Sequence, residues 1–393
     1  MRLWKFALIL SLATGHASSS ALAPELNDFQ ARCAIEGNRL WGRSLCVPVV
    51  IVDPVTGSFR ASRLAPGELP ATRANTAFEW GGEKWVMVLA PLPGDSAKLS
   101  SLLFHEAWHA HQGELGFAAN NSTAAHLQEL RPRYLIRLEW EALNRALNSR
   151  GTVQRRHIAQ ALAFRQQRLA RDARAANVER EQMRHEGLAA YTGASLSGAP
   201  LPLVLAELRT GASRPSLGRS FAYVSGPAWG ILLDQIRPAW RRALVTGIDF
   251  PDLMPIAAAP GSRADLYRGK EILREEALAD RERRARLAAA LYATAEKRAL
   301  RLPLVKMGMN FDPDRVGAGP DGSSLYEKIE LSDQWGTIKI DGVPLRITPD
   351  FSAAFARWPL TAPDHLELSP DWQVEELREG GAKLIRRLSE EIR

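Results

Sequence analysis

The chain has 393 residues, of which 46% are hydrophobic and 24% are charged. This is the composition of a globular protein rather than of a disordered chain, and it suffices for one large domain or two ordinary ones. The net charge is +7, but the arginines are spread through Ala-rich helical patterns and form no single block. We interpret them as solvated helix faces and expect no nucleic-acid partner.

The N-terminus resembles a secretory signal. Arg2 and Lys5 precede an apolar run over 6–14 that is too short to span a bilayer, and small residues follow at 15–23. The pattern predicts a signal peptide over 1–23, cleaved after Ala17 or Ala21. No later apolar run reaches membrane-spanning length. We therefore expect a periplasmic or secreted protein without stable membrane insertion.

The chain contains two cysteines, Cys33 and Cys46. An exported protein meets an oxidising compartment, where an even, closely spaced pair predicts one disulfide. Two buried free thiols are the alternative.

A small sheet is expected over 39–93, with strands at 47–54 and 80–93, a possible returning strand between them, and a turn at Gly81-Gly82. A helix should then run over 97–116, capped by Asp95 or Ser96.

Residues 122–301 show mainly helical spacing of apolar residues, including one long helix expected from Thr152 to about Tyr191. From Leu302 the pattern becomes strand-like, and Asp341-Gly342 predicts a hairpin. We expect a smaller β-rich C-terminal module over 302–393. The predicted fold class is α+β and predominantly α-helical.

The stretch "LLFHEAWHAHQ" at 102–112 places ionisable groups in an apolar helix. His105, Glu106 and His109 form the pattern H-E-x-x-H, in which residues four apart share a helix face and can ligate one ion. Zinc suits imidazole ligands in a tetrahedral site. Glu106 can act as the general base for water activated by the metal. His111 points away from the metal face, so we place it in the outer shell or on the surface.

A catalytic zinc site needs a third protein ligand. Our preferred candidate is Glu186 in "HEGLAAYTG", since small and apolar residues follow it and imply close packing. The alternative is that Glu186 belongs to a solvated face, as we expect for Glu179 and Glu181. Other candidate ligands are His185, His126, Glu139 and Glu141.

These motifs resemble the gluzincin division of zinc metallopeptidases, which includes the thermolysin-like enzymes. Four blocks ("LLFHEAWHAHQ", "HLQELRPRYLIRLEWEAL", "HEGLAAYTG" and "SFAYVSGPAWGILLD") also look like a group of uncharacterised exported bacterial proteins. With "LWGRSLCVPVVIVDP", the resemblance covers roughly 39–236 and omits the C-terminal module. It implies a zincin-like body over 24–301, with zinc held by His105, His109 and Glu186.

One departure from the resemblance concerns Ala190. Thermolysin-like enzymes often carry an Asp at that position, four residues after the ligand Glu, where it orients the first His. A hydrogen-bond donor for the developing oxyanion is also expected, and Tyr223 in "SFAYVSGPAWG" is preferred over Tyr191. Core packing of both rings is the alternative.

The sequence therefore predicts an exported zinc metallopeptidase with a peptide or protein substrate. The alternative is a zinc-binding cell-envelope protein without turnover, and a third hypothesis is a helical scaffold with no metal.

Overall fold

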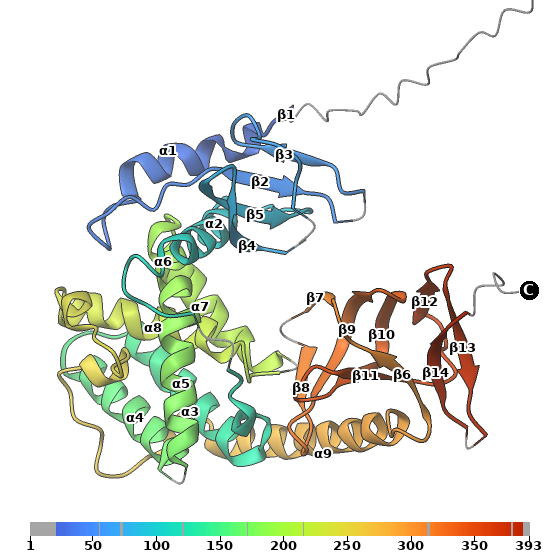
Figure 1. Cartoon of the computed structure of the whole chain (residues 1–393). Helices are drawn as coiled ribbons and strands as arrows, with labels where there is room; N and C mark the ends of the chain where they lie inside the picture. Colours follow the sequence, from blue (N-terminus) through green and yellow to red (C-terminus); the bar gives the residue numbers. More distant parts are fainter. Residues whose placement is uncertain are drawn as a thin grey trace, which may run out of the picture.

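The computed structural model describes residues 21–387 apart from 55, 71–73, 120–121, 171, 215, 313–314 and 379. Residues 1–20 of the predicted signal peptide lie outside this part. The fold is mixed α+β, with a small N-terminal sheet, a helical body and a C-terminal sheet (Figure 1). The coarse α+β prediction is confirmed.

The N-terminal sheet has the strand order β1-β3-β2-β5-β4. Gly81 and Gly82 connect β4 to β5 with φ values of 62° and 77°, left-handed conformations that suit a tight hairpin turn. The predicted turn is therefore confirmed. The strands are β1 (Ala21–Leu22), β2 (Val49–Val52), β3 (Phe59–Ala61), β4 (Thr76–Trp80) and β5 (Glu83–Leu89).

The two faces of this sheet are both covered, because alternate residues of a strand point to opposite sides. Val49 and Val86 belong to the main core that contains α2 (Ser96–His111), whereas Val50 and Trp85 pack in a separate cluster on the other face. The sheet thus gives α2 an apolar surface on which to lie.

A disulfide joins Cys33 of α1 (Asn27–Glu36) to Cys46, just before β2. The predicted pairing is confirmed. The bond ties the first helix to the sheet.

Helix α2 begins where the sequence predicted, because the Asp95 side chain accepts a hydrogen bond from the backbone N–H of Lys98 at 2.8 Å. It ends at His111 rather than near Gly116. The chain turns there, and the Phe117 N–H donates back to the Gln112 carbonyl at 3.0 Å.

The predicted single helix from Thr152 to Tyr191 is wrong. It breaks after Leu169, and Asp172 caps a new helix by accepting from the Arg174 N–H at 2.8 Å. After the break, the helical segment continues past Tyr191 and ends at Leu196.

The helical elements of the body are α3 (Leu130–Leu147), α4 (Gly151–Leu169), α5 (Ala173–Gln182), η3 (Met183–Gly187), α6 (Leu188–Leu196), α7 (Pro200–Thr210), α8 (Phe221–Ile236) and α9 (Gly269–Ala293). Short 3-10 turns are η1 (Pro24–Leu26), η2 (Ala125–Gln128), η4 (Gly211–Ser213), η5 (Trp240–Ala243), η6 (Pro251–Leu253) and η7 (Ala264–Tyr267).

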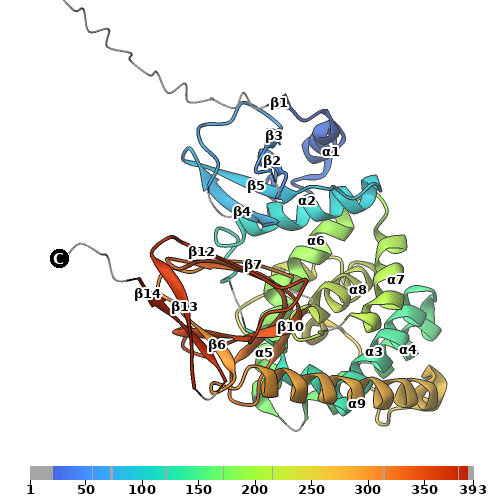
Figure 2. The ribbon, with the colours of Figure 1, turned by 90° about the vertical axis from the view of Figure 1, so that its right-hand side faces the viewer.

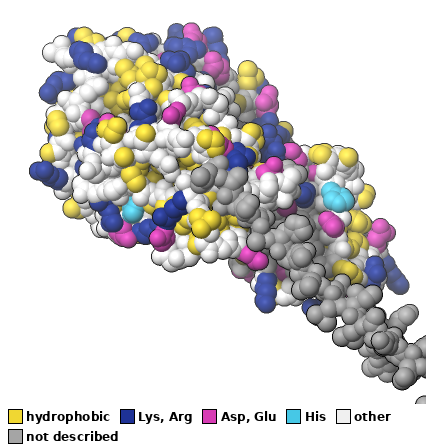
Figure 3. Space-filling model, turned by 90° about the horizontal axis from the view of Figure 1, so that it is seen from above, with side chains coloured by type: hydrophobic (Ala, Val, Ile, Leu, Met, Phe, Trp, Pro, Cys, Tyr) yellow, Lys and Arg dark blue, Asp and Glu magenta, His cyan; other side chains and the backbone are white. Residues whose placement is uncertain are grey.

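A buried ionic cluster lies between these helices. Glu179 is fully buried, so the expectation that it lies on a solvated face is wrong. Arg168 donates to Glu179 at 2.8 Å and to Glu139 at 2.6 Å, and Arg165 reaches Glu179 at 3.2 Å. Some arginines therefore hold the core together. On the face that Figure 3 shows, Lys and Arg side chains lie dispersed among acidic and neutral side chains.

The C-terminal sheet already begins at β6, slightly before Leu302, and follows the order β13-β14-β6-β11-β10-β9-β7, with β12 on β10 and β8 on β9. The hairpin predicted at Asp341-Gly342 is wrong. These residues lie inside β10, at an irregularity between Asp341 and Leu345 where the pairing with β9 shifts register. The strands are β6 (Ala299–Pro303), β7 (Gly308–Phe311), β8 (Val316–Ala318), β9 (Ser324–Asp333), β10 (Gly336–Ile347), β11 (Ala353–Arg357), β12 (His365–Leu368), β13 (Trp372–Glu376) and β14 (Ala382–Arg386).

The long helix α9 leaves the helical body and runs beneath the C-terminal sheet (Figures 1 and 2). It packs on α3 and contacts β10, so the sheet is held beside the body. Among the described residues, none of the helices combines the length and apolarity needed to cross a bilayer.

Candidate metal centre

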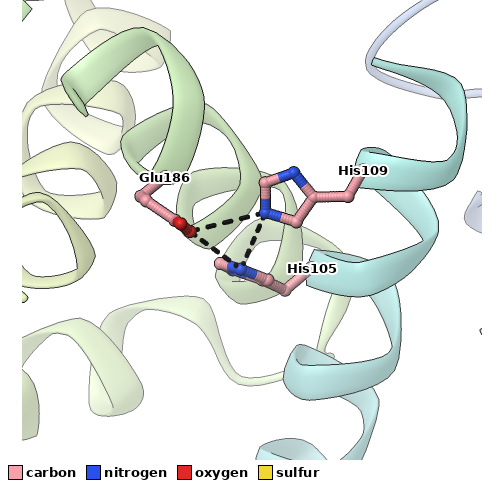
Figure 4. A group of neighbouring side chains, drawn as sticks. All are labelled: His105, His109 and Glu186. Atoms are coloured by element: carbon pink, nitrogen blue, oxygen red, sulfur yellow. Dashed lines mark hydrogen bonds and ion pairs between the residues drawn. The ribbon is translucent and has the colours of Figure 1, made fainter. Parts of the chain in front are cut away.

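Two histidines of α2 and one glutamate of η3 meet between the helices (Figure 4). The Nε2 atoms of His105 and His109 are 3.1 Å apart. The Glu186 Oε2 atom lies 3.3 Å from the first and 3.4 Å from the second. This is the one group with suitable metal-ligand atoms found among the residues that the structure describes.

Glu186 is aimed at the histidines by a local change of helix type. Residues Met183–Gly187 form a π-turn between α5 and α6, in which the Leu188 N–H donates to the Met183 carbonyl. Such turns are uncommon and occur frequently at functional sites, because the extra residue re-aims the side chains around it. The sequence pattern gave no sign of this turn.

Close helix packing holds the two parts together. A Cβ atom at Gly226 of α8 would lie 2.5 Å from the Cα and carbonyl oxygen of Gly187. A Cβ atom at Gly193 of α6 would lie 2.3 Å from the Ser101 carbonyl oxygen on α2. Glycine is therefore required at both crossings, of which one brings α6 against α2 and the other brings the Glu186 segment against α8.

We expect Gly226→Ala to weaken metal binding by roughly 10-fold or more and to cost about 1–3 kcal/mol of stability, because α8 must move away from Gly187. An exposed helical site would respond oppositely, since Ala favours helix over Gly. Zinc titration of metal-free protein against a competing chelator, together with thermal unfolding, checks this. Gly94→Ala, which meets no neighbouring atom within 4 Å, is the control. Unchanged zinc affinity would show that this contact does not position the site.

The distances fit a tetrahedral zinc ion. Zinc–ligand bonds of about 2.0–2.1 Å place neighbouring tetrahedral ligand atoms about 3.3 Å apart, close to the three separations above. Two imidazoles and one carboxylate are also a donor set of catalytic zinc sites. The Glu186 Oε2 atom is buried without a hydrogen-bond partner, which is expected of an oxygen atom that binds a metal ion.

Gln112 fixes the orientation of one ligand ring. Its side-chain oxygen lies 2.8 Å from His109 Nδ1, while its amide nitrogen donates to the Ala118 carbonyl at 2.7 Å. The oxygen can only accept, so the proton of a neutral His109 sits on Nδ1 and the Nε2 lone pair faces the ligand group. Gln112 thus supplies, for the second His, an orienting contact of the kind that Ala190 cannot make for the first.

Glu106 is buried beside the ligands and lines a cleft of about 650 Å³ that also exposes His105 and Glu186. Burial raises the pKa of the Glu106 carboxyl above its usual range, although the nearby His105 and His109 oppose this. Proximity to the ligands and a raised pKa are the properties expected of a general base.

Tyr223 lies at the same group. Its ring stacks on His105 with centroids 5.1 Å apart and planes 13° apart. Burial and the nearby Glu186 charge raise the pKa of Tyr223, so its hydroxyl keeps its proton. Tyr191 instead donates to Asp234 at 2.7 Å, away from the ligands.

The other candidate ligands do not join the group. His185 comes closest, with Nδ1 3.0 Å from the Gln112 oxygen and Nε2 3.5 Å from Glu186 Oε1, and burial lowers its pKa to about 4. His126 binds Glu179, and Glu139 belongs to the ionic cluster. Glu141 pairs with Arg268 at 3.4 Å.

His111 is buried rather than on the surface, with Nδ1 3.2 Å from Glu114 Oε2. It is not part of the ligand group.

Three residues of the site escaped the sequence reasoning. Gln112 could have been found, because it lies three residues after His109, at the end of the helix. Arg219 and Phe311 line the cleft, and Phe311 comes from the C-terminal sheet. Nothing in the local sequence signals that this strand reaches the site.

Comparison with protein-family models, with curated proteins and with solved structures finds no match to this chain.

Proposed function

We propose that the protein is an exported zinc-dependent peptidase. The observation that carries the proposal is the triangle of two Nε2 atoms and one Oε2 atom, 3.1–3.4 Å on each side, at the wall of a cleft that also exposes Glu106. The zincin-like assignment of the body and the gluzincin resemblance belong to the same proposal. The disulfide is compatible with an oxidising, exported location.

Bound at this group, zinc would polarise a substrate carbonyl and make a water molecule acidic near neutral pH. Glu106, which lines the same cleft, would take the proton from that water and pass it to the leaving amine. Its buried setting favours this exchange, because the pKa is raised toward the working range of a general base.

Tyr223 is proposed to stabilise the carbonyl oxygen as negative charge develops. Its ring is held by stacking on His105, and its raised pKa keeps the hydroxyl as a hydrogen-bond donor. Gln112 keeps His109 in the tautomer whose Nε2 would bind the ion.

Replacing Glu106 by Gln tests the catalytic assignment. We expect about one zinc per chain in both proteins, and a fall in kcat/KM for casein or a peptide library of roughly 100- to 10,000-fold in the variant. The measurements are metal analysis of protein never exposed to chelator and a cleavage assay. Full turnover in Glu106→Gln would contradict the role of this residue.

The alternative is a cell-envelope protein that binds zinc without turnover. It predicts the same zinc content but no cleavage by the wild-type protein. A structural zinc site has no need of a carboxylate beside its first histidine, which is why we favour the peptidase. Much less than about one zinc per chain would reject both zinc proposals.

A further inference from the structure

Arg219 is a cation in the proposed active-site cleft without an acidic partner. It lies in the turn before α8, lines the same cleft as His105 and Glu106, and is partly buried. Among the described residues, its guanidinium makes no ion pair or hydrogen bond. A partly desolvated guanidinium without a counter-ion is costly, and planar carboxylates are its preferred ligands.

The second arginine of the cleft behaves differently. Arg214 donates to Glu207 at 2.8 Å, and both residues line the cleft. Its charge is therefore matched by the protein itself. The remaining cleft carboxylates, Glu106 and Glu186, belong to the metal centre. Arg219 is thus the arginine of this cleft whose charge is left to be matched by a ligand.

Arg219 also shares the cleft with side chains that contact the ligand group. Tyr223 lines the same cleft, and its ring stacks on His105 with centroids 5.1 Å apart. Phe311 of the C-terminal sheet lines the cleft as well, and its ring packs on Tyr326 with centroids 5.1 Å apart. Arg219 therefore lines a cleft to which the helical body, the C-terminal sheet and the ligand group all contribute.

We infer that Arg219 binds a carboxylate of the substrate close to the bond that is cut, which makes the substrates peptides with a nearby negative charge. The carboxylate is either the free C-terminus or an Asp or Glu side chain. The inference rests on the proposed function, because it assumes that peptides enter this cleft.

The test measures binding, so it does not depend on turnover. Zinc-loaded Glu106→Gln protein is titrated calorimetrically with four short peptides. Two are neutral and differ only in a free or amidated C-terminus, and two are amidated and carry Glu or Gln in the chain. We expect a carboxylate-bearing peptide to bind roughly 10- to 100-fold more tightly than its neutral counterpart. The pair that shows the difference identifies the source of the carboxylate.

Adding Arg219→Gln should abolish the difference, and Arg219→Lys should keep part of it because the charge remains. Adding Arg214→Gln should leave the preference in place. Zinc content and circular dichroism confirm that each variant is folded. Equal affinity for all four peptides, no binding of any peptide, or a preference that survives Arg219→Gln would overturn the inference. Cleavage by the wild-type protein is measured in parallel, so failure of the peptidase proposal is recognised separately.

Discussion

Glu186→Gln is expected to lose bound zinc and all measurable peptidase activity. The carboxylate is the one oxygen donor of the ligand triangle, and two imidazoles alone leave a tetrahedral ion underligated. Loss of an outer contact to a zinc ligand typically costs about 10- to 100-fold in affinity, so loss of the ligand itself should cost about 1000-fold or more. Zinc titration against a competing chelator measures this directly.

Glu207→Gln is the matched control for that experiment. Glu207 is a carboxylate of the same cleft, but it pairs with Arg214 and is not part of the ligand group. Its replacement should leave zinc affinity within a few-fold of wild type. If Glu186→Gln still holds one zinc per chain with unchanged affinity, the three-ligand centre is wrong and the peptidase proposal loses its basis.

Glu179→Gln should destabilise the folded protein by about 3–5 kcal/mol at pH 7, although it touches no metal ligand. Glu179 is fully buried and accepts hydrogen bonds from Arg165 and Arg168. Removing its charge leaves two buried guanidinium groups with too little negative charge beside them. The resulting loss of folding stability is larger than the net contribution of the intact ion pairs. Urea unfolding at pH 7 measures the loss.

The difference in folding stability between wild type and Glu179→Gln should also depend on pH, in a direction that the pKa of Glu179 defines. Burial opposes ionisation of Glu179, but the charges of Arg168 and Arg165 and a contact with His126 hold its pKa well below the usual range. A depressed folded-state pKa contributes stability at pH values above the unfolded pKa of about 4.3, and this contribution shrinks as the pH falls. The stability gap between wild type and Glu179→Gln should therefore narrow below pH 4.3, by at most about 1.4 kcal/mol per pH unit.

Glu181→Gln, on the exposed side of the same helix, is the control. It should change stability by less than about 1 kcal/mol at either pH. A Glu179→Gln protein as stable as this control at pH 7 would show that the buried cluster is not important for folding.

The sequence alone determined the features that depend on near neighbours in the chain. His105 and His109 share a face because helix geometry repeats every 3.6 residues, and Asp95 caps their helix through its own local hydrogen bond. The Gly81-Gly82 turn and the α+β class follow from backbone preference and apolar periodicity in the same way. The disulfide followed from cysteine number, spacing and the expected oxidising location.

Only the tertiary structure decided which distant groups meet. Glu179 and Glu186 both looked like carboxylates of a helical segment, yet one lies in an arginine cluster and the other beside His105 and His109 in the candidate metal-ligand group. A π-turn over Met183–Gly187 and the close contact between Gly187 and Gly226 direct only Glu186 toward the histidines. Such packing depends on the partner helix rather than on the local sequence pattern. The same reason explains why Phe311, a strand residue of the C-terminal sheet, lines the cleft. Long-range contacts are set by how whole surfaces fit, which no short stretch of sequence records.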